Sequence, residues 1–187
     1  MKIGILTQPL LSNYGGILQC FALQTVLKRL GHDAWVIRRT YKGKRLSIIK
    51  CLFHYIKQII KVFLGQKFVK LSNKKKMIYV KKNTTYFVSK YINPKTEFIT
   101  TNSALNNYHQ KGNFDAYIVG SDQVWRPIYS PCITNYFLDF TSPDEKIKRI
   151  AYAASFGVND WEFTEEETVV CKDLLKKFDA MSVREDS

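Results

Sequence analysis

The chain has 187 residues, of which 45% are hydrophobic and 24% are charged. This length predicts one domain, and the apolar fraction is ample for a packed core, which excludes a disordered chain. No stretch approaches the roughly 18 consecutive apolar residues of a membrane span. Pro9 interrupts the first apolar residues too early for a secretory leader. We therefore expect a cytoplasmic protein.

The four cysteines occur singly, with no Cys-x-x-Cys pair and no cluster with the three histidines. Structural zinc sites need closely spaced ligands, and disulfide frameworks need paired cysteines in a secreted chain. We therefore expect reduced, mostly buried thiols, and neither a metal nor another cofactor.

The net charge of +13 is concentrated in one part of the sequence. Between Ala34 and Thr96 there are 17 lysines and arginines and no acidic residue, whereas the rest of the chain has 12 basic and 16 acidic residues. Such a block is typical of contact with nucleic acid, an acidic lipid surface or a phosphorylated substrate. A solvated face rich in lysine is the alternative.

The first 40 residues predict a strand, a loop, a helix and a second strand. Residues 2–8 have the apolar, β-branched character of a buried strand. After a glycine-containing loop, apolar residues recur at helical spacing over 17–30, and Gly31 is a C-terminal stop. Residues 33–38 predict the next strand. This order is typical of a βαβ unit in a parallel sheet.

Two stretches of the basic segment predict helices. Residues 46–65 repeat apolar side chains at helical spacing with lysines between them, which indicates an amphipathic basic helix. A weaker helical pattern covers 73–91 and ends before Pro94. Two interpretations of 46–65 stay open: it lies on a membrane surface, or its apolar stripe packs on its own domain.

Three further strands are predicted after the basic segment, at 114–119, 136–140 and 149–154. Thr164 caps a helix with three glutamates in its first turn, and 180–183 predicts a last strand. Because strands and helices alternate, we expect an α/β fold with a parallel sheet. We expect one domain over 1–187, with a basic helical insert at about 40–113.

The loop after the first predicted strand is the first candidate site. Open parallel sheets bind ligands at the carboxyl ends of their strands. This loop contains Asn13, Gly15 and Gly16 and opens the first helix. Its glycines let backbone N–H groups approach an anion at the helix N-terminus. A tight turn without a ligand is the alternative.

The loop after the strand at 114–119 is the second candidate. It brings Ser121, Asp122 and Gln123 together. Asp122 suits a proton acceptor or a ligand of sugar hydroxyls. The alternative is that Ser121 or Asp122 caps the next turn.

Ser155 follows the strand at 149–154, and Arg184 follows the last strand. We do not expect a Ser-His-Asp hydrolase, because there is no G-x-S-x-G elbow and no histidine lies in a strand-end loop. Arg184 has the planar guanidinium that binds carboxylate or phosphate with two N–H groups. A surface ion pair with Glu185 or Asp186 is its alternative role.

Together these segments resemble the polysaccharide pyruvyl transferase family. The strings Gly-Ser-Asp-Gln-Val-Trp and Tyr-Ala-Ala-Ser-Phe-Gly are the most specific in combination. Order and approximate spacing agree over 13–16, 18–19, 22–24, 115–125, 136–140, 150–157 and 182–185. The basic middle of the chain has no matching motif.

The resemblance implies a GT-B-like architecture, in which two Rossmann-like domains face a cleft. Residues 1–187 would be the N-terminal domain, so we expect the second domain to be absent from this chain and the chain to be incomplete alone. The implied reaction transfers a pyruvyl group from phosphoenolpyruvate to a sugar of a cell-surface glycan precursor, as a ketal. Such precursors are often lipid-linked, which implies a peripheral position at the inner face of the membrane through 46–65.

The resemblance also implies roles for the residues of the three loops. Asp122 would be catalytic, near the acceptor hydroxyls. Ser155 would shape the cleft, and Arg184 would bind an anionic group of the donor. The implied substrate-binding residues are Asn13, Gly15, Gly16, Ser121, Gln123, Ser155 and Arg184.

Two other functions stay open at this point. The fold also suits half of a glycosyltransferase that uses a nucleotide sugar, because fold alone does not determine function. The basic segment also fits a non-catalytic module that binds anions or nucleic acid, since Tyr79, Tyr86, Phe87 and Tyr91 interleave with lysines. No known RNA- or DNA-binding motif matches, which disfavours nucleic acid.

Overall fold

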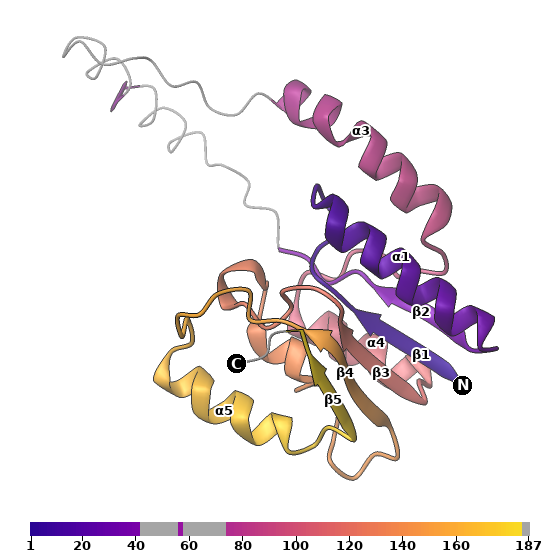
Figure 1. Cartoon of the computed structure of the whole chain (residues 1–187), viewed down its shortest axis with the longest axis vertical. Coiled ribbons are helices and arrows are strands. Elements are labelled where there is room, and N and C mark those ends of the chain that lie inside the picture. The colour runs from indigo at the N-terminus through magenta and orange to yellow at the C-terminus, as the bar shows by residue number, and fades with distance from the viewer. Residues whose placement is uncertain (42–55, 58–73, 185–187) are drawn as a thin grey trace. The chain divides into compact units, whose positions relative to one another are not determined.

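A computed structural model describes residues 1–41, 56–57 and 74–184, and for 74–80 it describes the backbone alone (Figure 1). The chain divides into two compact units, Lys42–Asn83 and a unit that combines Met1–Tyr41 with Thr84–Ser187. The second of these contains the sheet. The part of the predicted insert that begins at Thr84 therefore belongs to the sheet-containing unit. Apart from 56–57, the helix predicted at 46–65 lies outside the described residues.

The sheet has five strands, and all of its pairings are parallel. The strands are β1 (Lys2–Leu6), β2 (Asp33–Ile37), β3 (Ala116–Gly120), β4 (Lys148–Ala154) and β5 (Ala180–Val183). Their order is β2-β1-β3-β4-β5, an order common among doubly wound sheets. The expected α/β, Rossmann-like parallel sheet is therefore confirmed. After β1 the chain runs to β2 on one side of the sheet, and after β3 it runs to β4 on the other side. The loops that follow β1 and β3 therefore diverge and leave a crevice between them.

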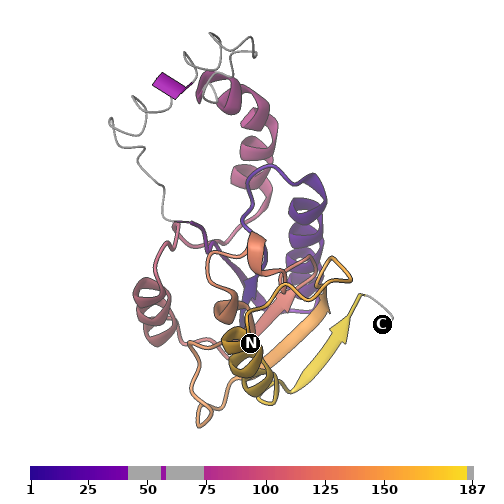
Figure 2. The same ribbon diagram turned by 90° about the vertical axis from the view of Figure 1, so that its left-hand side faces the viewer.

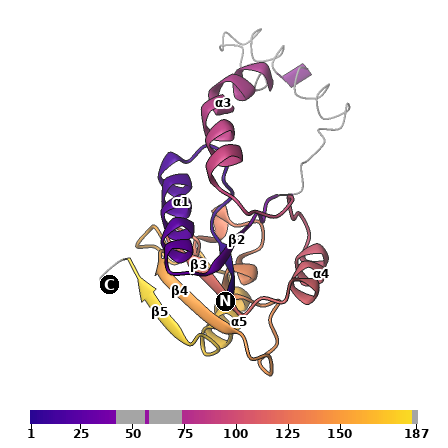
Figure 3. The same ribbon diagram turned by 90° about the vertical axis from the view of Figure 1, so that its right-hand side faces the viewer.

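Helices cover both faces of this sheet (Figures 2 and 3). Side chains of α1 (Tyr14–Arg29) and of the end of α3 (Lys74–Tyr91) pack on one face. Side chains of α4 (Asn102–Gly112) and α5 (Glu165–Leu175) pack on the other. Within the described ranges, no helix has both the length and the apolar character needed to span a bilayer.

The strand sequences explain why both faces are covered. In β1, Ile3 and Ile5 point to the face of α1, and Leu6 points to the opposite face. In β3, Ile118 packs with the α1 face, and Tyr117 packs with the other. Side chains that alternate in this way and are apolar on both faces require a helical layer on each side.

One predicted strand is wrong. Residues 136–137 end the 3₁₀ helix η2 (Ile133–Phe137), and 138–140 form a turn in which Leu138 adopts a left-handed conformation with φ of +59°. The apolar run that resembles a strand instead fills the core beneath the sheet, where Tyr136, Phe137 and Leu138 are all buried. Continuous apolar runs do not distinguish buried strands from buried helical turns.

Helix α4 has no counterpart among the predicted elements. Its sequence is polar, and only Leu105 and His109 are buried, so it lacks a strong hydrophobic period. Its ends carry ordinary signals, because Thr101 caps the first turn and Asn113 closes the last in a left-handed conformation. His109 contacts Tyr117 Oη through Nδ1 at 2.9 Å, which fixes α4 against β3.

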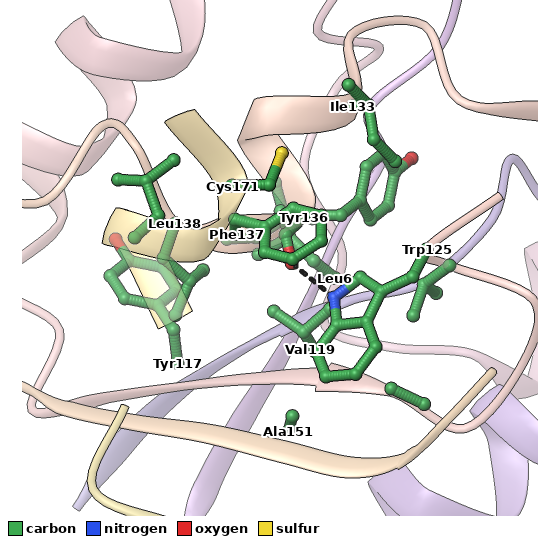
Figure 4. Packing of buried hydrophobic residues seen from close by; sticks show 14 of the residues in the cluster. Leu6, Tyr117, Val119, Trp125, Ile133, Tyr136, Phe137, Leu138, Ala151 and Cys171 are labelled. Atoms are coloured by element: carbon green, nitrogen blue, oxygen red, sulfur yellow. Dashed lines mark hydrogen bonds between the residues drawn. The ribbon is translucent and has the colours of Figure 1, made fainter. Parts of the chain in front are cut away.

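The core beneath the sheet anchors the loop that follows β3. Trp125 is 2% exposed, and its indole N–H donates to the carbonyl of Tyr136 at 3.1 Å (Figure 4). Its ring stacks on Phe137 with centroids 5.3 Å apart. Tyr136 in turn donates through its hydroxyl to the carbonyl of Thr7, just after β1. These contacts hold the loops after β1 and β3 in fixed positions.

The described cysteines are free thiols. Cys20 and Cys171 are buried, and burial raises the pKa of each to about 12, so neither is a thiolate at neutral pH. Cys132 is half-buried. Cys51 lies outside the described residues.

Candidate functional site

A cavity of about 850 Å³ opens where the loops after β1 and β3 diverge. The loop after β1 and the first turns of α1 form one wall, and Asp122 and Gln123 come from the loop after β3. Tyr41, Tyr129 and Arg184 complete the lining. A cavity of this volume, at the switch point of a parallel sheet, has the size and place of a small-molecule site.

The positive end of α1 borders this cavity. Asn13 is the N-cap, and its side-chain oxygen accepts from the backbone N–H of Gly16 at 3.3 Å. The first turn has no acidic residue. The first N–H groups of a helix have no acceptor within it, and Gly15, in this first turn, lines the cavity, so its N–H suits a ligand with negative or hydroxyl oxygens.

Asp122 is the carboxylate of the site. It is 6% exposed, and its Oδ1 accepts from the backbone N–H of Gln123 at 2.8 Å. Within the described part of the chain, its Oδ2 has no hydrogen-bond partner. A Cβ atom at Gly16 would come within 2.3 Å of this Oδ2, so a side chain at this position would displace the carboxylate. A buried acceptor without a partner is costly, and it is ready to accept from a substrate hydroxyl.

Two glycines let the neighbouring loops fit together. Gly120 has φ of +128°, and a Cβ there would lie 2.0 Å from the carbonyl oxygen of Tyr152 in β4. Gly157 has φ of +75° and lies against the side chain of Gln123. Gly120 needs glycine, because its backbone conformation and the nearby backbone of Tyr152 both disfavour a side chain, whereas a Cβ at Gly157 would displace the side chain of Gln123.

Ser155 holds the backbone of Asp122 in place through a hydrogen bond. Its backbone N–H donates to the carbonyl of Asp122 at 3.2 Å, and its own carbonyl accepts from the N–H of Trp125 at 3.2 Å. It is fully buried. The loop after β4 is therefore bonded directly to the loop that carries the carboxylate.

Arg184 brings a positive charge to the same cavity. Its Nη2 donates to Ser155 Oγ at 3.0 Å, and its backbone N–H donates to the carbonyl of Ala154 at 3.1 Å. The expected position after the last strand is confirmed, since Arg184 follows β5 directly. A carboxylate and a guanidinium thus line one cavity, which suits a substrate with both hydroxyl and anionic groups.

The structure brings most of the predicted site residues together. The cavity is lined by Asn13, Gly15, Gly16, Asp122, Gln123 and Arg184. Ser155 is not among the lining residues, but it forms hydrogen bonds with both Asp122 and Arg184. The structure describes all of the predicted site residues. Ser121 is the exception among them, because it does not line the cavity and does not support a residue that does. Their roles stay predictions.

Sequence reasoning missed several lining residues. Gln8 follows β1, and its side-chain amide donates to the carbonyl of Gln123 at 2.8 Å. Tyr41 follows β2, and its hydroxyl reaches the carbonyl of Ile128 at 3.4 Å. The rule that ligands bind after strand ends would have found both. Tyr129 belongs to the 3₁₀ helix η1 (Pro127–Tyr129), and no sequence signal marks it.

The described residues offer no group of three His, Cys, Asp or Glu side chains that could hold a metal ion.

Comparison with known proteins identifies one family. A family model described as polysaccharide pyruvyl transferase matches residues 13–187, which include all of the cavity's lining residues except Gln8, Pro9, Leu11 and Ser12. No protein of curated function matches the sequence.

Proposed function

Because the chain belongs to the polysaccharide pyruvyl transferase family, we propose that its cavity takes part in transferring a pyruvyl group from phosphoenolpyruvate to a sugar of a cell-surface glycan precursor. The observation that carries this proposal is Asp122, which lines the cavity and whose buried Oδ2 has no hydrogen-bond partner among the described residues.

The reaction determines which groups the site must contain. A proton adds to the methylene carbon of phosphoenolpyruvate, and its C2 becomes electrophilic. One sugar hydroxyl attacks C2 and loses its proton. The second hydroxyl forms the other C2–O bond as the C2–O bond to phosphate breaks. Two C–O bonds and one C–H bond form, and inorganic phosphate leaves with the remaining proton.

Asp122 serves the acceptor side in this proposal. Its carboxylate accepts a hydrogen bond from an attacking hydroxyl and takes the proton as the C–O bond forms. Its backbone carbonyl is held by Ser155, and its Oδ1 is held by Gln123. The carboxylate is thus fixed before substrate arrives, which lowers the entropic cost of orientation.

Arg184 and the first turn of α1 serve the donor side. Phosphoenolpyruvate carries a phosphate and a carboxylate. A guanidinium binds either group with two N–H bonds, and a helix N-terminus binds either through backbone N–H groups. Among the described lining residues, Arg184 is the one cation. We therefore propose that further cationic groups come from a second, GT-B-like domain, whether on the same polypeptide or on a partner.

The test incubates the protein, together with its second domain on the same polypeptide or as a partner, with phosphoenolpyruvate and simple glycosides that have free neighbouring hydroxyls. We expect phosphate release that depends on the glycoside, and a pyruvate ketal on the product by NMR and mass spectrometry. Asp122→Asn keeps the shape of the side chain but removes the base, so ketal formation should fall by about 100-fold or more. Asp173→Asn is the matched control, because Asp173 lies on α5 and pairs with Lys176 away from the cavity.

Two results would overturn the proposal. The first is unchanged ketal formation in the Asp122→Asn variant, which removes the base role. The second is phosphate release that does not depend on any glycoside, which removes the transfer itself.

A further inference from the structure

Two tyrosine rings line the cavity without a role in the reaction described above. Tyr41 follows β2, and Tyr129 ends η1. They are 48% and 47% exposed, and both line the cavity that contains Asp122. A tyrosine ring that is half-exposed inside a concave site offers apolar area to a ligand.

The ring of Tyr129 is held in place from one side. The guanidinium of Arg126 lies over it, 4.6 Å from the ring centroid. Arg126 is itself fixed by two hydrogen bonds to the carboxylate of Glu162, at 2.8 and 2.9 Å. These bonds raise the pKa of Arg126 and lower that of Glu162, so both groups keep their charges at neutral pH. A ring fixed in this way loses little entropy when a ligand binds.

Tyr41 is tied to the same segment. Its hydroxyl reaches the carbonyl of Ile128, the residue before Tyr129. Two residues earlier, Arg39 is buried, and its guanidinium donates to Asn135 at 2.7 Å and to Asn102 at 2.9 Å. The backbone that presents Tyr41 is therefore anchored in the core, and the two tyrosines are connected through one hydrogen bond.

The remaining lining groups determine which ligand fits these rings. Asn13, Gln19 and Gln123, whose side chains are amides, are among the residues that line the cavity together with Asp122. Amides and carboxylates match the donors and acceptors of sugar hydroxyls. A pyranose ring has such hydroxyls at its edge and apolar C–H groups on its face, so it needs both polar partners and an apolar platform.

We infer that Tyr41 and Tyr129 form an aromatic subsite that binds the apolar face of the pyranose ring of the acceptor, while the ring's hydroxyls face Asp122. This inference rests on the proposed function and assigns its acceptor side to named residues. The two tyrosines then determine acceptor affinity, and phosphoenolpyruvate binds without them.

The experiment measures binding of methyl glycosides of galactose, glucose and mannose by saturation-transfer NMR and titration calorimetry, and binding of phosphoenolpyruvate separately. Tyr41→Leu and Tyr129→Leu remove the rings but keep apolar side chains. Each should weaken glycoside binding by about 3- to 10-fold, the range expected for one aromatic stacking contact. Tyr41→Phe and Tyr129→Phe keep the rings and should bind nearly as the wild type does.

A matched control is available on β4. In the part of the chain that the structure describes, Tyr152 is 53% exposed and is not among the residues that line the cavity. Tyr152→Leu should leave glycoside binding unchanged. Phosphoenolpyruvate affinity should not change in any of the five variants.

The inference fails if both leucine variants bind glycosides as tightly as the wild type. It also fails if the wild type binds none of the glycosides, if the phenylalanine variants lose as much affinity as the leucine variants, or if nucleosides show the tyrosine dependence instead. Glycoside binding that depends on the rings, without any phosphoenolpyruvate binding, would support the subsite and contradict the donor part of the proposed function.

Discussion

Replacing Gly16 by alanine tests how closely α1 approaches Asp122. The new Cβ would lie 2.3 Å from Asp122 Oδ2, about 1 Å closer than van der Waals contact allows. The backbone of Gly16 is in the first helical turn and is bonded to its cap, so it yields less easily than the carboxylate does. We expect Asp122 to move by about 1 Å.

The effect on stability should be small. Overpacking of this kind costs about 1–3 kcal/mol, and alanine is about 1 kcal/mol more favourable than glycine in a helix. The free energy of unfolding should therefore fall by about 0–2 kcal/mol, a loss of about 0–8 °C in melting temperature for a chain of this size.

The effect on the site should be large. A misplacement of about 1 Å in a catalytic group costs up to about 100-fold in rate. Differential scanning fluorimetry would give the melting temperature, and ketal formation from phosphoenolpyruvate and a glycoside would give the activity. We expect a folded protein with little activity.

Gly15→Ala is the matched control in the same turn. The atom nearest to its new Cβ is Asn13 Oδ1 at 3.4 Å, an ordinary contact. This variant should be as stable as the wild type or slightly more so, and it should keep its activity. Equal activity of the two variants would refute the reasoning, because it would show that contact between Gly16 and Asp122 does not determine the position of the carboxylate.

Further predictions concern stability, pH and membranes. Gly120→Ala should lower the free energy of unfolding in urea by about 2–5 kcal/mol, because the strain of a positive φ adds to the clash of a Cβ 2.0 Å from a carbonyl oxygen. Gly31→Ala is the control, since this glycine has φ of +83° but open space around it, and it should cost only about 1–2 kcal/mol. Equal losses in the two variants would show that crowding is not the cause. Hydrogen bonds from Arg126 lower the pKa of Glu162 below its ordinary 4.5, so the stability that this carboxylate contributes is present above pH 4.5 and is lost as pH falls through the lowered pKa. Glu162→Gln should therefore be less stable than the wild type near about pH 7, and the difference should shrink on acidification. A difference that stays constant with pH would contradict the ion pair between these two residues. The chain should co-sediment with vesicles of anionic lipid, and replacing the lysines of 46–65 by glutamine should weaken vesicle binding by about 1 kcal/mol for each lysine at the surface. Binding that does not depend on salt concentration, or no binding at all, would contradict the membrane contact.

Local periodicity was enough to predict the five strands that form the sheet. Alternating apolar residues such as Ile3 and Ile5 define β1, and the helical spacing that ends at Gly31 defines α1. Thr164 and Glu167 form the capping box that begins α5. These signals lie within a few residues of the element that they specify, so one sequence contains them.

Elements that depend on distant partners were not predictable in this way. Residues 136–140 are as apolar as a strand, but they end as a 3₁₀ turn because the core under Trp125 needs bulky side chains there. Helix α4 is polar and is held by the buried contact of His109 with Tyr117. In both places tertiary packing decides the local structure, and local propensity does not.

The same distinction applies to the candidate site. The segments that contain Gly16 and Asp122 were predictable as site segments, because glycines and a carboxylate that follow strands are a recognisable pattern. Their contact was not, since it depends on the strand order that makes β1 and β3 neighbours. Tyr129 was missed because its place in the cavity depends on the fold of η1 and on the Arg126 guanidinium over its ring.

The most direct test of the site is a map of backbone amide chemical shifts during titration with phosphoenolpyruvate and with a methyl glycoside. Shifts should concentrate at 13–16, 122–123 and 155, and at Arg184, which line or support the cavity. Shifts confined to the opposite edge of the sheet, around Asp115 and Lys148 at the beginnings of β3 and β4, would contradict this prediction.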